Sequence, residues 1–260
     1  MSGSSIFVNG LNLSIRRCNW AESEKKPELV FLHDSLGCIT TWGNFPDILS
    51  ERLGFPYLVY DRQGHGNSDP LQSKNRDADY HKQEAEILIS LLRSLSIERP
   101  ILFGHSDGGT IALIAAALYP KYITGVISEA GHVFLEPKTI DGILAAKDYY
   151  AEHKGLSSRL AKHHGEKAGT LLASWTENWL KPQFRNWNIE HYLPDIECPT
   201  LVIQGEDDEF ATLSQVESIC FKISGPAVSC VLADIGHIPH KAAREEVLNV
   251  VEKFILRYCV

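Results

Sequence analysis

Residues 101–109 read ILFGHSDGG, and the alanine-rich run TIALIAAA follows at 110–117. The first three residues are apolar, as in a buried strand, and the second run is typical of a helix. Between them, Gly104, Ser106 and Gly108 form the pattern G-x-S-x-G at a sharp strand-to-helix turn, where a side chain at either glycine would clash with neighbouring segments. The helix begins just beyond the serine, so its free N–H groups face any negative charge that develops there. The pattern therefore predicts a serine nucleophile.

Short apolar runs alternate with helical patterns on both sides of this turn. The runs lie at 29–32, 57–60, 101–103, 123–127, 201–203 and 228–232, and such runs are typical of parallel strands buried on both faces. Helical spacing is clearest at 80–95 and after Pro239. Near the start, Asn9-Gly10 separates two β-type runs, which predicts a tight hairpin. Together these patterns predict a three-layer α/β fold with a hairpin in front.

One long block interrupts this alternation. From about Lys138 to Leu193 there is no strand-like run, and three of the five tryptophans lie there, at positions 175, 179 and 187. We predict a helical insertion over the sheet, because structureless stretches of this length are rare in compact domains. An ordinary crossover with a long loop is the alternative.

A serine nucleophile needs a base, and the base needs an acid that orients it. The strand at 201–203 leads into the acidic run at 206–209, EDDE, and the loop after the last strand holds Gly236-His237. Both follow strand ends, which share one edge of a parallel sheet with the serine turn. Two earlier loops follow strands at the same edge: residues 33–37, HDSLG, where a second oxyanion N–H is expected, and residues 61–68, DRQGHGNS, which would support the serine turn.

These five motifs together resemble those of the α/β-hydrolase fold superfamily, and the resemblance covers essentially the whole chain. It implies an eight-stranded, mostly parallel sheet flanked by helices, with a helical cap inserted after strand six. We accordingly expect residues 1–132 and 194–260 to form the core, and residues 133–193 to form the cap.

The resemblance also implies roles for individual residues. By motif position, Ser106 would be the nucleophile, Asp208 the acid and His237 the base. The backbone N–H groups of Ser35 and Asp107 would form the oxyanion hole. The spacing of the family's motif selects Asp208 from its acidic neighbours.

Substrate contacts are expected from the loops and the insertion around the serine. Most family members have His-Gly where this chain has His33-Asp34, so the Asp34 carboxylate either meets the substrate or caps its own loop. His132 follows the strand at 123–127 and faces the same edge of the sheet. The substrate contacts that we expect are Asp34, Leu36, His132, Trp179 and Ile238.

The sequence thus predicts a serine hydrolase that cleaves a small carboxylic ester or thioester through an acyl-enzyme. Two alternatives stay open. Capped proteins of this family also cleave carbon–carbon bonds or act as lactonases, commonly with an arginine for a charged tail, and Arg159 and Arg185 are candidates for it. The fold also serves as a non-catalytic ligand receptor or scaffold.

The composition excludes other classes of protein. The 25 Lys and Arg residues against 33 Asp and Glu give a net charge of −8, which argues against nucleic acid or an anionic membrane as a partner. The longest apolar run, at 111–119, is about half as long as a membrane span. The first residues lack the positive region and apolar core of a secretory signal. We therefore expect a cytoplasmic protein that acts on a small molecule.

No metal or cofactor is expected. His237 and His240 give H-x-x-H, and His163 and His164 are adjacent, but neither pair has Cys or carboxylate partners at ligand spacing. The six cysteines include no C-x-x-C pair and are expected to be reduced. The sequence carries no signal for an oligomeric state.

Overall fold

The structure, a computed structural model, describes residues 4–18 and 26–260. Residues 1–3, on which the expectation about a secretory signal partly rests, lie outside the described residues. The strands are β1 Ser4–Val8, β2 Leu11–Cys18, β3 Glu28–Leu32, β4 Tyr57–Tyr60, β5 Pro100–His105, β6 Gly125–Glu129, β7 Thr200–Gly205 and β8 Ala227–Leu232. The α-helices are α1 Phe45–Leu53, α2 Tyr80–Ser94, α3 Asp107–Leu118, α4 Pro137–Glu152, α5 Lys154–His164, α6 Ala168–Trp179, α7 Ser214–Lys222, α8 Pro239–Ala242 and α9 Arg244–Tyr258. Short 3-10 helices are η1 Ile39–Trp42, η2 Gly165–Lys167, η3 Pro182–Phe184 and η4 Glu190–Asp195.

Within these residues the eight strands form one sheet in the order β1-β2-β4-β3-β5-β6-β7-β8. The strands from β4 to β8 pair in parallel, whereas β1 with β2 and β2 with β4 pair antiparallel. The predicted eight-stranded, mostly parallel sheet is therefore confirmed. The hairpin is confirmed as well: Asn9 and Gly10 have φ of 51° and 83°, as the two central residues of a type I′ turn require.

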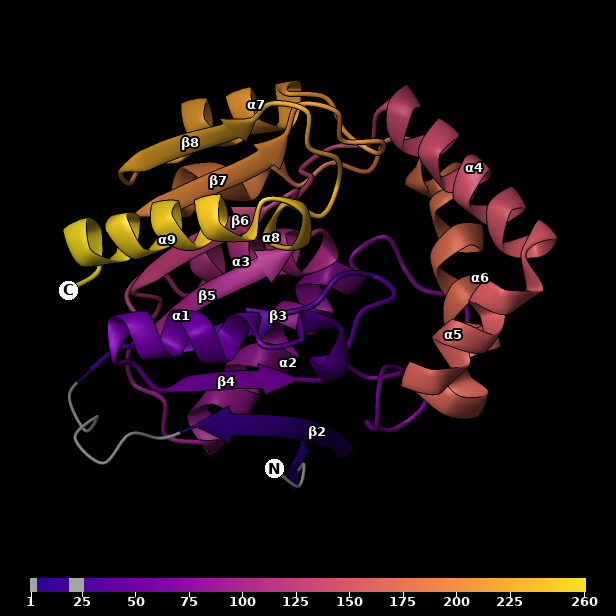
Figure 1. The fold of residues 1–260 in the computed structure, drawn as a ribbon, viewed down its shortest axis with the longest axis horizontal. Coiled ribbons are helices and arrows are strands. Elements are labelled where there is room, and N and C mark those ends of the chain that lie inside the picture. The colour runs from indigo at the N-terminus through magenta and orange to yellow at the C-terminus, as the bar shows by residue number, and fades with distance from the viewer. Residues whose placement is uncertain (1–3, 19–25) are drawn as a thin grey trace.

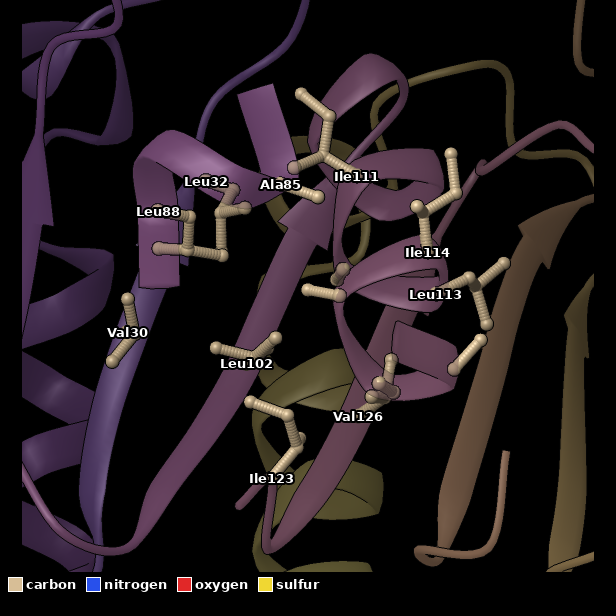
Figure 2. Packing of buried hydrophobic residues seen from close by; sticks show 14 of the residues in the cluster. Val30, Leu32, Ala85, Leu88, Leu102, Ile111, Leu113, Ile114, Ile123 and Val126 are labelled. Atoms are coloured by element: carbon tan, nitrogen blue, oxygen red, sulfur yellow. The ribbon is translucent and has the colours of Figure 1, made fainter. Parts of the chain in front are cut away.

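Two apolar layers sandwich the sheet, because successive strand residues point to opposite faces. Leu102 and Val126 belong to the layer that includes α2, α3 and α7, as Figure 2 shows for α2 and α3. Phe103 and Ile127, one position later in the same strands, face the layer of α1 and α9. These layers fix the strand ends, and so they fix the loops that follow them (Figure 1).

Three details differ from the sequence predictions. The strand at 228–232 was expected to be buried on both faces, but β8 is an edge strand whose alternate residues are exposed. The strand predicted at 123–127 begins at Gly125. The helical pattern after Pro239 forms two helices, because Ala243 leaves the helical conformation at φ −124° and ψ 47°.

Helices α4, α5 and α6 lie between β6 and β7 in the sequence, where a helical insertion was predicted. They stand beyond the carboxyl ends of the parallel strands (Figure 1). The segments that lead into and out of them run side by side. The Leu135 N–H donates to the Trp187 carbonyl at 3.1 Å, and the Ile189 N–H donates to the Val133 carbonyl at 2.7 Å.

Two further observations bear on the class of protein. In the described ranges, no helix is both long enough and apolar enough to cross a bilayer. All six cysteines are free thiols in the structure.

The turn between β5 and α3 has a strained backbone. Ser106 has φ 55° and ψ −118°, a region that a serine enters only when its surroundings impose it. A side chain at Gly104 would fall on the Gly108 carbonyl, and one at Gly108 would fall on the Leu32 carbonyl. The turn can therefore close only with glycine at both positions.

We predict that Gly104→Ala destabilises the protein by about 1–3 kcal/mol, because the added methyl group overpacks a backbone contact. The measurement is the free energy of unfolding in urea. Gly169→Ala is the matched control: Gly169 lies in α6 with open space around it, so alanine there should keep or raise stability by up to about 1 kcal/mol. Equal stabilities for the two variants would contradict this account of the turn.

Candidate active site

Three side chains from distant parts of the chain meet at the carboxyl edge of the sheet. The Ser106 hydroxyl lies 3.0 Å from Nε2 of His237. Nδ1 of His237 lies 2.9 Å from each carboxylate oxygen of Asp208. Ser106 follows β5, Asp208 follows β7 and His237 follows β8. The structure thus brings together the three residues to which the sequence assigned a nucleophile, an acid and a base.

The Asp208 carboxylate fixes the orientation of the His237 ring. Burial alone would raise the pKa of Asp208, but hydrogen bonds from His237 and from the Phe210 N–H hold that pKa below its ordinary value. A charged carboxylate accepts a hydrogen bond from the Nδ1–H of His237, which leaves the Nε2 lone pair directed at the serine. Asp207 is exposed. Glu209, which sequence reasoning did not single out, accepts the His237 backbone N–H at 2.9 Å.

Two backbone N–H groups beside Ser106 are available to a negatively charged oxygen. Ser35 and Asp107 both line the cavity above the serine. Across the described residues, neither of their N–H groups donates a hydrogen bond. The Asp107 N–H also belongs to the first residue of α3, where the helix dipole favours negative charge.

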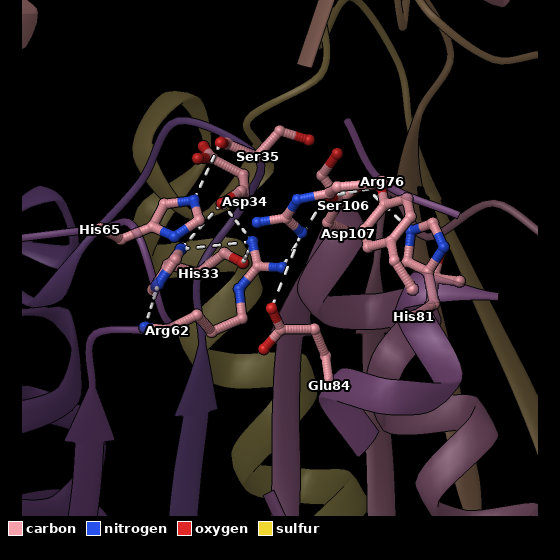
Figure 3. A network of polar contacts seen from close by, with 12 residues as sticks. His33, Asp34, Ser35, Arg62, His65, Arg76, His81, Glu84, Ser106 and Asp107 are labelled. Carbon is pink, nitrogen blue, oxygen red and sulfur yellow. Dashed lines mark hydrogen bonds and ion pairs between the residues drawn. The ribbon is translucent and has the colours of Figure 1, made fainter. Parts of the chain in front are cut away.

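A buried arginine holds the loop that carries Ser35. The Arg62 guanidinium donates to the His33 carbonyl at 3.2 Å and to the Asp34 carbonyl at 2.7 Å (Figure 3). The Arg62 backbone N–H donates to Nε2 of His33 at 3.0 Å. Nε2 of His65 lies 3.1 Å from the Ser35 carbonyl. These contacts hold the loop in place, with Ser35 in the lining of the cavity.

Asp34 both caps its loop and lines the cavity. One carboxylate oxygen accepts the Leu36 N–H at 3.0 Å, and the other lies 3.4 Å from Nδ1 of His105. Burial would raise the pKa of Asp34, but the His105 ring holds it well below its ordinary value. His105 lies beneath the turn, as expected, with Nε2 2.8 Å from the His237 carbonyl. It therefore links the carboxylate in the cavity wall to the loop that carries His237.

The Asp107 side chain sits in a second polar cluster, which sequence reasoning missed. It accepts hydrogen bonds from the Tyr80 hydroxyl at 3.1 Å and from Nε2 of His81 at 3.3 Å. Arg62 and His132 lie 3.8 Å and 3.7 Å away. Burial would raise the pKa of Asp107, but His81 and Arg62 hold it well below its ordinary value. The helical signal at 80–95 was the only sign that α2 would face this region.

Above Ser106 lies a cavity of about 250 Å³. All five expected substrate contacts line it: Asp34, Leu36, His132, Trp179 and Ile238. Further lining residues were not singled out as contacts, namely Ala130, Thr139, Ile143, Ala146, Tyr150, Trp175, Phe210 and Ala211. Most of them belong to α4 and α6 or to the loop after β7, and the lining is mainly apolar. Neither Arg159 nor Arg185 lines it, and both are exposed.

An open groove of about 800 Å³ lies next to the cavity, beside α4. Four residues line both spaces: Ala146, Phe210, His237 and Ile238. His237 therefore borders both the cavity and the groove.

Comparison with known proteins agrees with this geometry. Residues 27–173 match the family described as α/β hydrolase fold. The chain belongs to this family. The resemblance noted from the motifs is thereby confirmed.

Relatives of this α/β hydrolase fold protein include hydrolases. "Serine hydrolase BPHL" of Mus musculus is 25% identical and matches over 98% of this chain and 87% of its own. "2-(acetamidomethylene)succinate hydrolase" of Mesorhizobium japonicum is 28% identical over 96% of this chain and 94% of its own. The crystal structure of the enol-lactonase from Burkholderia xenovorans LB400 matches with a TM-score of 0.77 at 21% identity. The match covers 97% of this chain and 100% of the enol-lactonase chain. With these relatives, the chain is a hydrolase of the α/β fold.

Two groups of side chains in the described part of this α/β hydrolase have the spacing of metal ligands. Neither is a histidine pair that the sequence singled out. The first group is His81, Asp107 and His132. The Arg62 guanidinium lies 3.8 Å from Asp107, and its positive charge would repel a bound cation. The second group is His105, Glu129 and His240. The Glu129 carboxylate already accepts hydrogen bonds from Nδ1 of His240 at 2.5 Å and from the His240 backbone N–H at 2.6 Å. We assign no metal to either group.

A buried histidine of α5 fastens the helices beyond the sheet to the loops of the site. Nδ1 of His164 accepts the Gly66 N–H at 2.9 Å, and Nε2 lies 3.0 Å from the Leu36 carbonyl. This pattern requires a neutral ring with its proton on Nε2. Burial lowers the pKa of His164, in agreement with the neutral form.

We predict that the α/β hydrolase loses stability as the pH falls from 7 to 5. Burial lowers the native pKa of six histidines, so below about pH 6.5 the unfolded chain binds protons that the native chain does not. Each such ring removes up to about 1.4 kcal/mol per pH unit. His105, whose pKa is raised by Asp34, acts in the opposite direction. The measurement is the free energy of unfolding in urea at each pH. The six histidines whose pKa is lowered are His33, His65, His81, His132, His164 and His240.

A pair of variants isolates one ring. His164→Gln keeps a donor and an acceptor but cannot take up a proton, so it should reduce the slope of stability against pH. His163→Gln is the control, because the His163 side chain is exposed. A wild-type free energy of unfolding that stays constant or rises as the pH falls from 7 to 5 would refute this prediction.

Proposed function

We propose that this chain is a serine hydrolase that cleaves a small carboxylic ester or thioester through an acyl-enzyme on Ser106. The observation that carries the proposal is the continuous contact from Ser106 to His237 to Asp208, at 3.0 Å and 2.9 Å. In this arrangement a serine hydroxyl becomes a nucleophile at neutral pH.

The first half of the reaction forms the acyl-enzyme. The Ser106 oxygen attacks the carbonyl carbon while its proton moves to Nε2 of His237. The carbonyl oxygen becomes an oxyanion and accepts hydrogen bonds from the backbone N–H groups of Ser35 and Asp107. The intermediate then collapses, and His237 gives its proton to the departing alcohol or thiol.

The second half releases the product. His237 removes a proton from a water molecule, and the resulting hydroxide attacks the acyl carbon. A second oxyanion forms at the same two N–H groups. Its collapse breaks the bond to Ser106, the serine oxygen regains the proton from His237, and the carboxylic acid leaves.

The cavity supports a small substrate without an anionic acyl group, because the charged Asp34 carboxylate lines it. Its volume of about 250 Å³ suits a short chain, and no lysine or arginine is among its lining residues. The leaving group must lie next to His237, which donates its proton, and His237 also lines the groove beside α4. We therefore propose that the leaving group occupies the groove side and departs there.

Residues 133–193 are proposed to act as a cap that selects the substrate. The supporting observation is that α4 and α6 supply Tyr150, Trp175 and Trp179 to the cavity wall. The remaining residues, 1–132 and 194–260, would form the core that carries the reacting groups. No second function is proposed. Arg159 and Arg185, the candidates for binding a charged tail in the carbon–carbon hydrolase or lactonase alternative, do not line the cavity.

The decisive variants change one group of the proposed triad at a time. Ser106→Ala should lower kcat on 4-nitrophenyl butanoate by about 10⁴-fold or more, because the nucleophile is lost. Asp208→Asn should lower kcat by about 10⁴-fold, because the ring of His237 is no longer held in the required tautomer. Asp207→Asn is the matched control and should retain wild-type kcat, since its side chain is exposed beside the site.

A fluorophosphonate probe tests the same assignment without turnover. It should label the wild type and the Asp207→Asn variant and leave Ser106→Ala unlabelled. Labelling or turnover that survives Ser106→Ala would remove Ser106 from the mechanism.

A further inference from the structure

The ring of His132 is held rigidly in the cavity wall by groups outside the proposed triad. Its backbone N–H and carbonyl both bond the Thr110 hydroxyl, at 3.1 Å and 2.7 Å. The ring centroid lies 5.2 Å from that of Trp179 and 5.3 Å from that of Trp187. His132 is therefore preorganised, and a contact with it needs little ordering on binding.

The two ring nitrogens of His132 face different surroundings. Nε2 is buried without a hydrogen-bond partner and lies 3.7 Å from a carboxylate oxygen of Asp107. Nδ1 makes no hydrogen bond in the part of the chain that the structure describes. Unlike Nε2, it is not fully buried. Because the residue lines the cavity, Nδ1 is the nitrogen that a bound molecule can reach.

The charge of Asp107 decides which nitrogen carries the proton. A lone pair on Nε2 that faced this carboxylate would be repelled, whereas an N–H there is attracted. The neutral ring then carries its proton on Nε2 and presents the Nδ1 lone pair to the cavity. Burial lowers the pKa of His132 to about 3, so the ring stays neutral at physiological pH.

His132 lies on the acyl side of the reacting bond. The leaving group must be next to His237, at the junction with the groove. Phe210 and Ile238 line both the cavity and the groove, whereas His132 and Trp179 line the cavity alone. His132 and Trp179 thus face the acyl group of the substrate, which stays bonded to Ser106 in the acyl-enzyme.

We propose that Nδ1 of His132 accepts a hydrogen bond from a hydroxyl group on the acyl chain, so that the preferred substrates are esters or thioesters of short hydroxy acids. The inference rests on the proposed ester hydrolysis at Ser106. A neutral acceptor in a largely apolar wall suits a neutral donor, because an ammonium group would lose its hydration without gaining a charge partner from this ring. A wall residue that bonds a substrate hydroxyl discriminates against the analogue that lacks it.

The test compares 4-nitrophenyl butanoate with its 2-hydroxy and 3-hydroxy derivatives. The wild type should show a kcat/KM about 10-fold higher for at least one hydroxy ester than for the butanoate. In His132→Phe, which keeps an aromatic ring but has no acceptor, the ratio of the two kcat/KM values should fall to about 1. The ratio cancels any general loss of activity caused by the substitution.

Two further variants keep the test specific. His132→Asn restores an acceptor on a smaller side chain and should recover part of the ratio. Thr139→Val is the matched control, because Thr139 lines the cavity but its hydroxyl already donates to the Phe210 carbonyl at 2.7 Å. Its ratio should equal that of the wild type.

The outcomes separate this inference from the proposed function. Ester turnover that depends on Ser106 but shows no preference for either hydroxy ester, or a preference that persists in His132→Phe, overturns the role of His132 alone. Absence of turnover on all three esters, together with a lack of fluorophosphonate labelling, would instead count against the proposed function.

Discussion

The backbone of Ser106 is the constraint on which the site depends. Its φ of 55° places the hydroxyl above the edge of the sheet, and a conformation of this kind costs about 1–3 kcal/mol, which packing elsewhere must offset. The fully buried strand β5 and helix α3 supply that packing on either side of the turn. The same turn places Asp107 in the lining of the cavity and sends its side chain into the buried cluster with His81. One strained residue thereby sets the positions of the Ser106 hydroxyl, of Asp107 and of one wall of the cavity.

Buried charge does the rest of the positioning. Arg62 is 1% exposed and sits between the loop that carries Ser35 and the Asp107 carboxylate. Removing one partner from such a group leaves an uncompensated charge, so these contacts favour a single arrangement more than they add stability. The two imidazole–carboxylate contacts of the cavity, His237 with Asp208 and His132 with Asp107, follow the same physics. In each, a buried carboxylate favours the ring tautomer that carries its proton on the nitrogen nearer to it.

Local sequence was enough to predict what depends on backbone constraint. Gly104 and Gly108 mark a turn that no other residue fits, and the apolar runs mark strands covered on both faces, so the serine turn and the parallel part of the sheet could be predicted from the residues. The eight-stranded sheet and the choice of Asp208 and His237 as partners of Ser106 came from the resemblance to the α/β-hydrolase fold superfamily. The edge position of β8 could not, because its apolar run is identical in kind to those of central strands. The cavity wall could not either: Tyr150 and Trp175 reach it through the packing of α4 and α6, and His81 reaches Asp107 through the packing of α2 on α3. Such contacts arise from tertiary structure and leave no motif.

The account stands on a covalent intermediate at Ser106, and the most direct measurement is to trap it. The protein is mixed with a 4-nitrophenyl ester, quenched in acid during turnover and digested, and the peptides are analysed by mass spectrometry. The account predicts an acyl group on the peptide that contains Ser106, appearing within the first turnover and disappearing when the ester is exhausted. Steady turnover with no acyl group on this peptide, or with the group on another residue, would contradict it.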